Sequence, residues 1–339
     1  MVREGRQELN EPPTSMTAGR KLSPRPAASA GWALPAACPL QHASGVHPAV
    51  FSDRSYSMLQ KRLQRLEELA AAKPALAEIC RFYARLYKLF ATAENFLRVD
   101  IDHETATLRQ QQGFPLLSGE TLNIDENRAR AFFADLLLIL QQHGQQGQEE
   151  LKALETTLQS DRLDLTGLLR AALDRDRKPI TGTAETIGMQ PALLEYCLTT
   201  TLGAALERCR AEGLESRTEN WEHGYCPLCG GLPAIAELSG KEGKKKLQCS
   251  LCGSRWSFHR LTCIHCGNSD HETLAYFTAE GEPDYRVDIC RKCCGYLKVV
   301  DSRERGEGLP LEVEDAATLH LDLLAAKEGF SRGRKETPG

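Results

Sequence analysis

The sequence has no long hydrophobic run and no strong excess of charge of either sign. The longest apolar stretch, residues 132–140, is too short to cross a bilayer and contains Asp135. A net charge of -4 over 339 residues argues against a general nucleic-acid-binding protein. The sequence also lacks a Gly-rich phosphate loop, a G-x-S-x-G turn and an H-E-x-x-H motif. We therefore expect neither membrane insertion nor an enzyme of these classes.

We find no secretory signal in the sequence. The nearest candidate, residues 27–38, is short and is broken by Pro35. Cysteine is abundant instead: nine of the 13 cysteines lie within residues 226–294, mostly as C-x-x-C pairs. This spacing is typical of metal ligands rather than disulfides. We therefore expect a reducing, cytoplasmic location.

The first part of the chain divides into a tail and a helical domain. Residues 1–52 are rich in Pro, Ala, Ser and Gly and predict a disordered N-terminal extension. Residues 53–220 have apolar residues at helical spacing and almost no strand-like alternation, which predicts an all-α domain. Within this domain we expect loops at 113–119 and 177–183, and small buried side chains at Cys80, Cys197 and Cys209.

From about Trp221 the sequence changes to cysteine pairs separated by short strand-like segments. Each module consists of a knuckle, a hairpin, a second knuckle and one more strand, and this layout is written twice, over residues 221–262 and 263–305. It is the layout of a zinc ribbon or a rubredoxin. The sequence thus predicts an α+β multidomain protein with two tandem rubredoxin-like modules.

The repeat indicates how the cysteines are grouped. In the sequential scheme, one metal is held by Cys226, Cys229, Cys249 and Cys252, and the other by Cys263, Cys266, Cys290 and Cys293. A cross-braced scheme would interleave the pairs, but the hairpin inside each module favours the sequential one. The alternatives to cysteine near the knuckles are four histidines, His223, His259, His265 and His271.

Four thiolates around one ion suit zinc or a single iron, and spacing alone does not separate the two metals. Each site would be closed, with no open position for water or substrate, so hydrolytic metal catalysis is not expected. The four lysines at one hairpin tip, Lys241, Lys244, Lys245 and Lys246, are interpreted as a solvated turn, because residues 221–310 carry equal numbers of basic and acidic residues.

Cys294 stands where the other three knuckles have glycine after their second cysteine. That position favours a left-handed backbone, which glycine adopts without steric cost. Gly295 could supply the turn one residue later, and Cys294 remains an alternative to Cys293 as a ligand. Beyond the modules, residues 306–330 predict one C-terminal helix packed on the body, and residues 331–339 a polar tail.

The sequence resembles the FdhE family of formate dehydrogenase accessory proteins. The resemblance rests on C-P-L-C-G at 226–230, C-S-L-C-G-S-R-W at 249–256, L-T-C-I-H-C at 261–266 and I-C-R-K-C at 289–293, and it covers roughly residues 53–330. The sequence departs from the family at Cys294, where glycine is usual.

The resemblance implies a cytoplasmic assembly factor rather than an enzyme. Its partner would be the molybdenum- or tungsten-containing catalytic subunit of a respiratory formate dehydrogenase, and a homodimer is compatible with the sequence. The eight paired cysteines would bind two metal ions, with rubredoxin-type iron favoured by the resemblance and zinc not excluded. A rubredoxin-like electron carrier and, less favoured, a nucleic-acid-binding zinc ribbon are the alternatives.

Overall fold

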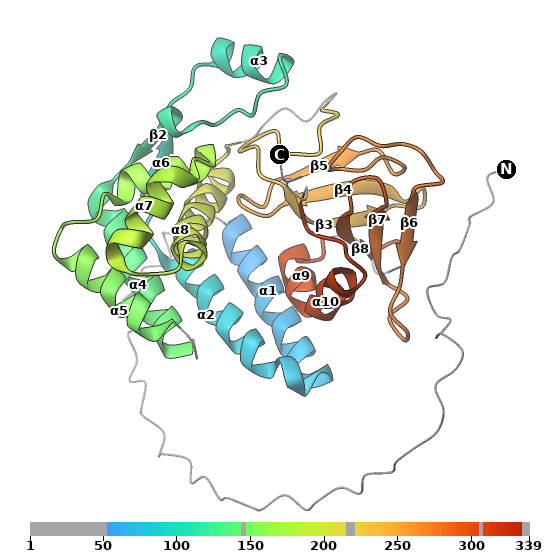
Figure 1. Cartoon of the computed structure of the whole chain (residues 1–339), viewed down its shortest axis with the longest axis horizontal. Coiled ribbons are helices and arrows are strands. Elements are labelled where there is room, and N and C mark those ends of the chain that lie inside the picture. Colours follow the sequence, from blue (N-terminus) through green and yellow to red (C-terminus); the bar gives the residue numbers. More distant parts are fainter. Residues whose placement is uncertain (1–52, 144–146, 215–220, 305–307, 334–339) are drawn as a thin grey trace, which may run out of the picture. The chain divides into compact units, whose positions relative to one another are not determined.

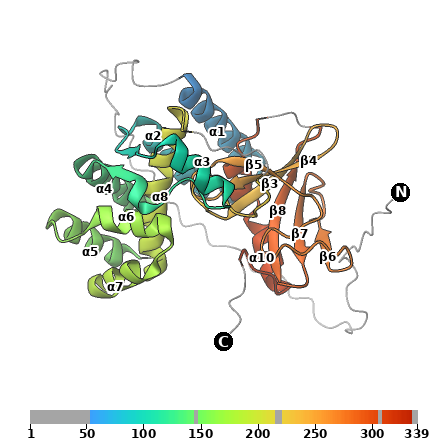
Figure 2. The ribbon, with the colours of Figure 1, turned by 90° about the horizontal axis from the view of Figure 1, so that it is seen from above.

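The computed structural model describes residues 53–143, 147–214, 221–304 and 308–333, all within one unit of the chain, Phe51–Gly339. These residues form a helical half, a six-stranded sheet and two short C-terminal helices (Figures 1 and 2). This confirms the expected architecture. The extension predicted for residues 1–52 and most of the polar tail lie outside the described residues.

The helical half follows the apolar periodicity of the sequence. Its α-helices are α1 (Asp53–Ala72), α2 (Ala77–Thr92), α3 (His103–Gln111), α4 (Glu126–His143), α5 (Gln148–Gln159), α6 (Leu165–Asp174), α7 (Arg177–Ile187) and α8 (Pro191–Ala211). Pro74 begins a 3₁₀ turn, Pro74–Leu76, just before α2, and a second such turn spans Gly119–Thr121. A pair of three-residue antiparallel strands, β1 (Leu97–Val99) and β2 (Leu122–Ile124), was not expected from the sequence.

Helix α8 is the centre of the helical half. It contacts α4, α6 and α7, and its buried side chains include Leu194, Leu198 and Leu206. Cys80, Cys197 and Cys209 are also buried, as expected. Burial of leucine on this scale is the main stabilising term in a helical core, at roughly 25 cal/mol per Å² of apolar surface.

The predicted loop at residues 177–183 is wrong, because this segment begins α7. Asp176 caps the helix by accepting a hydrogen bond from the backbone N–H of Lys178. Pro179 lies in the first turn, where its missing N–H would have had no helical partner. A capping aspartate and an early proline start a helix here rather than break one.

The six strands form a single sheet in the order β5-β4-β3-β8-β7-β6. They are β3 (Pro233–Ser239), β4 (Lys244–Cys249), β5 (Arg255–Phe258), β6 (Leu274–Phe277), β7 (Tyr285–Cys290) and β8 (Gly295–Asp301). Each module contributes three antiparallel strands, as its repeat predicts. The two modules join where β3 pairs in parallel with β8, with Ile235 opposite Lys298.

The prediction of a solvated lysine turn is wrong for Lys245. Its side chain is 3% exposed, and its Nζ lies 2.8 Å from Oδ2 of Asp288 on β7. Because β3 and β8 separate β4 from β7, this ion pair crosses one face of the sheet from the first module to the second. Lys244, by contrast, is exposed and pairs with the exposed Glu242.

The expected C-terminal helix is divided at Thr318 into α9 (Leu311–Ala317) and α10 (Leu319–Lys327). The buried ammonium group of Lys298 explains the break. It donates to the backbone carbonyls of Asp315 and Thr318, at 2.7 and 3.3 Å, and to Oδ2 of Asp322 at 2.8 Å. Carbonyl groups that a continuous helix would have used internally are bonded to a side chain of the sheet instead.

Ion pairs connect α9 to the first helix. Arg62 pairs with Glu312, and Nε of Arg65 lies 2.6 Å from the fully buried Glu314. Apolar side chains of α1, α2 and α9 form a common cluster around these pairs. The C-terminal helices therefore connect the sheet to the helical half. No helix within the described residues is long and apolar enough to cross a membrane.

Candidate metal centres

Each cysteine knuckle is a tight turn closed by backbone hydrogen bonds. In the first, the N–H of Gly230 donates to the carbonyl of Cys226 at 2.8 Å, and Gly230 has a φ of 71°. The second and third knuckles repeat this bond from Gly253 and Gly267. Such a turn brings two cysteine side chains to the same side, as a shared ion requires.

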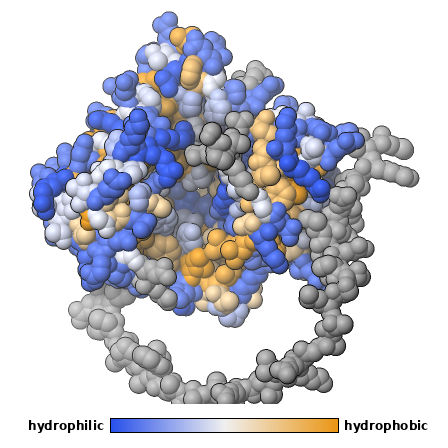
Figure 3. All heavy atoms as spheres, viewed as in Figure 1, coloured by the Kyte–Doolittle hydropathy of each residue, from blue (hydrophilic) through white to orange (hydrophobic). Residues whose placement is uncertain are grey.

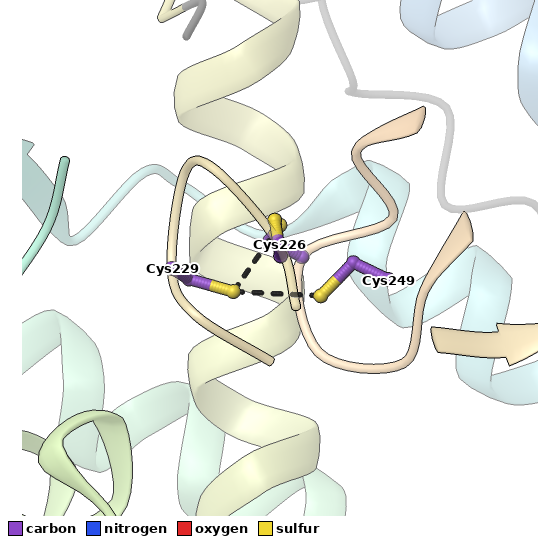
Figure 4. Close-up of side chains that lie close together, drawn as sticks. Cys226, Cys229 and Cys249 are labelled. Carbon is purple, nitrogen blue, oxygen red and sulfur yellow. Dashed lines mark hydrogen bonds between the residues drawn. The ribbon is translucent and has the colours of Figure 1, made fainter. Parts of the chain in front are cut away.

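The first group of sulfurs comes from the two knuckles of the first module. The Sγ of Cys229 lies 3.4 Å from that of Cys249 and 3.5 Å from that of Cys252, while the sulfurs of Cys226 and Cys252 are 3.6 Å apart. Figure 4 shows three of these side chains converging in front of a helix. All four cysteines are buried.

The second group has the same design in the second module. The Sγ of Cys263 lies 3.6 Å from that of Cys293, and the Sγ of Cys266 lies 3.7 Å from that of Cys290. Two of its cysteines, Cys266 and Cys293, are partly exposed. The grouping in both modules is the sequential one and not the cross-braced one.

Both groups have dimensions that suit a tetrahedral metal ion. Within each group the four sulfurs all lie within 4.8 Å of one another. A metal–sulfur bond of about 2.3 Å in a tetrahedron separates the sulfurs by about 3.8 Å. A small inward or outward movement of each thiol would therefore be enough to bind zinc or iron, and either ion fits.

The acidities of the thiols show how strongly burial and the neighbouring sulfurs act on each group. Burial raises the pKa of Cys249 well above its usual range. Burial acts in the same direction on Cys252, but hydrogen bonds from neighbouring sulfurs outweigh it and lower the pKa of Cys252. In the second group the pKa of Cys290 is lowered, although burial opposes this, whereas burial raises the pKa of Cys293 to about 11. Four thiolates can coexist in such a site only if a cation compensates their charge.

The fourth knuckle shows which of its adjacent cysteines faces the group. Cys293 belongs to the four-sulfur group, and Cys294 does not. Cys294 has a φ of 56°, so it adopts the left-handed backbone that glycine has in the other three knuckles. Gly295 does not supply the turn, since its φ is not positive; it lies against the ring of His265, which a Cβ atom would approach to 2.4 Å.

The nearby histidines have other roles. The Nε2 of His265 lies 3.1 Å from the carbonyl oxygen of Tyr296, and the ring of His223 stacks on that of Tyr225 at 4.8 Å. His259 lies 3.9 Å from Glu222 in an exposed position. In the described part of the chain the two candidate groups consist of cysteine alone.

The sequence did not predict the side chains that attach the helical half to the first centre. Arg175, the C-cap residue that follows α6, donates to the carbonyl of Cys229 at 3.0 Å. Arg210 of α8 donates to the carbonyl of Cys252, also at 3.0 Å. Positive φ at Arg175 marks an unusual helix end, but φ cannot be read from sequence, and neither arginine belongs to a recognisable motif.

These features define a class: a helical domain joined to two ribbon modules, each with a closed group of four cysteines. Residues 261–337 match the family model described as FdhE, C-terminal domain. A protein FdhE homolog of Aquifex aeolicus is 26% identical over 285 residues, which cover 82% of this chain and 94% of that protein. Protein FdhE of Salmonella arizonae is also 26% identical, over 84% of this chain and 89% of its own length.

The crystal structure of the FdhE protein from Pseudomonas aeruginosa has a similar fold. Its TM-score is 0.56 at 24% sequence identity, and the match covers 84% of this chain and 95% of that chain. The expected resemblance to FdhE proteins is thereby confirmed over most of the chain.

Proposed function

We propose that this protein is a cytoplasmic accessory factor that binds the catalytic subunit of a respiratory formate dehydrogenase and assists its maturation. The helical domain, residues 53–220, and the two modules, residues 221–262 and 263–305, together provide the binding surface. The protein itself catalyses no reaction in this scheme. The proposal is supported chiefly by the similarity to FdhE proteins over most of the chain, together with the two closed four-sulfur groups.

The eight clustered cysteines are the proposed metal ligands: Cys226, Cys229, Cys249 and Cys252 in the first centre and Cys263, Cys266, Cys290 and Cys293 in the second. Four protein sulfurs leave no open position for water or substrate, so the centres suit a structural or redox role rather than hydrolysis. Iron is favoured by the resemblance, and zinc fits equally well. Elemental analysis and an absorption spectrum of anaerobically purified protein distinguish the two metals.

Deletion and capture experiments test the proposed function. Deleting the gene should abolish respiratory formate dehydrogenase activity, and a plasmid copy should restore it. Anaerobically purified tagged protein should retain the catalytic subunit. Intact activity in the deletion strain, together with no retained subunit, would rule the proposal out.

A rubredoxin-like electron carrier is the alternative that one observation favours. Cys266 and Cys293 are partly exposed, and electron transfer benefits from a metal centre near the surface. This alternative requires iron in the second centre and visible absorption that bleaches reversibly on reduction. Colourless protein that contains only zinc would exclude it.

A further inference from the structure

A cavity of about 490 Å³ lies between the helical half and the first module. Its walls come from α1, α2 and α8, from the knuckle after Cys252, and from Glu312 of α9. Figure 3 shows this face of the molecule hollowed between the helices and the sheet, with hydrophilic surface in the hollow and a hydrophobic patch beneath it. The volume is within the usual range for ligand-binding pockets.

The charged side chains in the cavity wall are four arginines and two glutamates, namely Arg62, Arg208, Arg210, Arg255, Glu207 and Glu312. Arg62 is neutralised within the wall, because it forms a two-pronged pair with Glu207 and a second pair with Glu312. The other three arginines give the cavity its positive character.

These three arginines differ in how far their charge is compensated. Arg208 forms an ion pair with Glu212 at an N–O distance of 3.7 Å, and Arg255 forms one with Glu237 at 3.6 Å. Arg210 donates to the carbonyl of Cys252, and among the described residues no carboxylate pairs with it. An incoming anionic group is therefore attracted first to Arg210.

The remaining lining limits the kind of anion. Four side chains, Met58, Leu59, Phe90 and Leu214, give the cavity an apolar wall. The carboxylates of Glu207 and Glu312 are paired with Arg62, but their remaining lone pairs can accept hydrogen bonds from peptide N–H groups. A guanidinium matches a carboxylate in shape and charge. A polypeptide that carries a carboxylate beside an apolar side chain matches the guanidinium, the apolar wall and the hydrogen-bond acceptors of the cavity.

We propose that this cavity binds a short polypeptide segment of the client protein, with a carboxylate on Arg210 and an adjacent apolar side chain against Met58 and Phe90. The inference rests on the proposed function, in which the client is the formate dehydrogenase catalytic subunit. One wall of the cavity consists of Gly253 and Ser254, which directly follow the proposed ligand Cys252. The site is therefore complete only when the first centre is folded.

The test uses the full chain with its metals bound and labelled overlapping peptides that cover the catalytic subunit. Fluorescence anisotropy should identify binding peptides that contain Asp or Glu next to an apolar residue. Replacing the Asp or Glu of a binding peptide by Asn or Gln should weaken its binding about tenfold or more, because charge-assisted hydrogen bonds are lost. The proposal would be overturned if peptides bound equally well without the carboxylate, or if millimolar inorganic phosphate displaced the peptides.

Two cavity variants and one control test the assigned residues. Arg210→Gln and Met58→Asp should each weaken peptide binding about tenfold. Met58→Asp is informative even if Arg210→Gln disturbs the first centre, because Met58 lies on α1 and is 38% exposed. Arg177→Gln, on the exposed surface of α7, should leave binding unchanged. Metal content should be equal in Met58→Asp, Arg177→Gln and the unaltered protein.

Capture of the whole catalytic subunit separates this inference from the proposed function. If the unaltered protein retains the subunit and Met58→Asp loses most of it, both ideas are supported. If the two retain it equally, the cavity is not the binding site, but the proposed function stands. If the unaltered protein retains none, the cavity proposal fails, and formate dehydrogenase activity in the deletion strain decides whether the proposed function fails as well.

Discussion

The two metal-binding modules repeat the same sequence pattern but have different surroundings. All four cysteines of the first group are buried, and they belong to the same hydrophobic cluster as the leucines of the helical half. In the second group Cys266 and Cys293 are partly exposed. Leu297 and Val299 of the second module join that main cluster, but its other buried apolar side chains form smaller clusters with the C-terminal helices.

The difference extends to the backbone around the sulfurs. In the first knuckle, the carbonyl of Cys229 accepts a hydrogen bond from the side chain of Arg175. The carbonyls of Pro227 and Leu228 accept hydrogen bonds from the backbone N–H groups of Leu116 and Leu117, respectively. In the second knuckle, the carbonyl of Cys252 accepts a hydrogen bond from Arg210. In the second module, the side-chain bond to a sulfur comes from Asn268, within the same module.

Two centres with the same ligand pattern can therefore differ in how much of the fold they support. The first centre lies inside the main core and supports the contact between helices and sheet. The second is built from the knuckles of the β6–β8 half of the sheet, and two of its cysteines are partly exposed. We therefore expect loss of the first centre to damage the whole fold and loss of the second to be local.

The largest expected effect is that of removing one ligand from each centre. Cys229→Ser should abolish binding at the first centre and destabilise the helical half, since metal binding in such sites contributes on the order of 10 kcal/mol to folding. Cys293→Ser should lose one metal per chain and keep the helical circular dichroism and a cooperative unfolding transition. Equal damage from the two variants, measured by metal content and urea unfolding, would remove the distinction between the centres.

The ion pair that crosses the sheet is expected to have the next largest effect. Asp288→Asn leaves the buried ammonium of Lys245 without its carboxylate, and we expect a loss of about 3 kcal/mol in the free energy of unfolding. Urea unfolding of the metal-loaded protein measures this loss.

Two further variants serve as controls for the ion pair. The double variant Lys245→Met with Asp288→Asn should recover part of the stability, because it removes the buried ammonium group, while both variants lose the pair between Asp288 and Arg286 alike. Glu242→Gln breaks an exposed pair and should cost less than about 1 kcal/mol. A loss from Glu242→Gln as large as that from Asp288→Asn would show that burial does not set the effect.

Release of the metals to a chelator should occur in two phases. The second centre should lose its ion first, because Cys266 and Cys293 are accessible and the first group is covered by α8 and its neighbours. We expect rates that differ about tenfold or more, which corresponds to only about 1.4 kcal/mol in activation free energy. Cys293→Ser should remove the fast phase and leave the slow one, and release in a single phase would contradict the comparison.

The smallest expected effect concerns Cys294. Cys294→Gly should stabilise the protein by about 1 kcal/mol, because glycine has no steric cost at a φ of 56°. Both metals should remain bound. Loss of one metal would show that Cys294, and not Cys293, is the ligand.

Gly267→Ala is the matched test of the corresponding position in the preceding knuckle. Nothing lies within 4 Å of a Cβ atom there, so the substitution changes the backbone preference without creating a clash. We expect a loss of about 1 kcal/mol in the free energy of unfolding. An unchanged stability would show that the knuckle tolerates side chains at this position.

Much of the fold could be predicted because it depends on local patterns. Both modules have the strands that the repeat predicts, and helices α1 to α8 lie within residues 53–220, where the apolar periodicity predicts helices. The strands β1 and β2 were missed because three residues are too few for an alternating pattern. The start of α7 was missed because Pro179 and Gly182 were given more weight than the cap at Asp176.

Long-range contacts could not be predicted in the same way. The burial of Lys245 depends on Asp288, which is 43 residues away, and the break between α9 and α10 depends on Lys298 in the sheet. Nothing in the local sequence of either lysine distinguishes it from the exposed Lys244. Such positions are determined by which strands become neighbours, and the parallel pairing of β3 with β8 has no sequence signal.

The sequence by itself determined the composition of the two groups, because C-x-x-C spacing and a short hairpin limit which sulfurs can meet. It also placed Cys294 where the other three knuckles have glycine, but it left open whether Cys294 or Gly295 supplies the turn, and the structure shows the left-handed backbone at Cys294. Only the tertiary structure decided that the two modules share one sheet and that one centre is covered while the other is partly open. The physical reason is that ligand grouping follows from short chain closures, whereas burial depends on the distant helices that pack over each module.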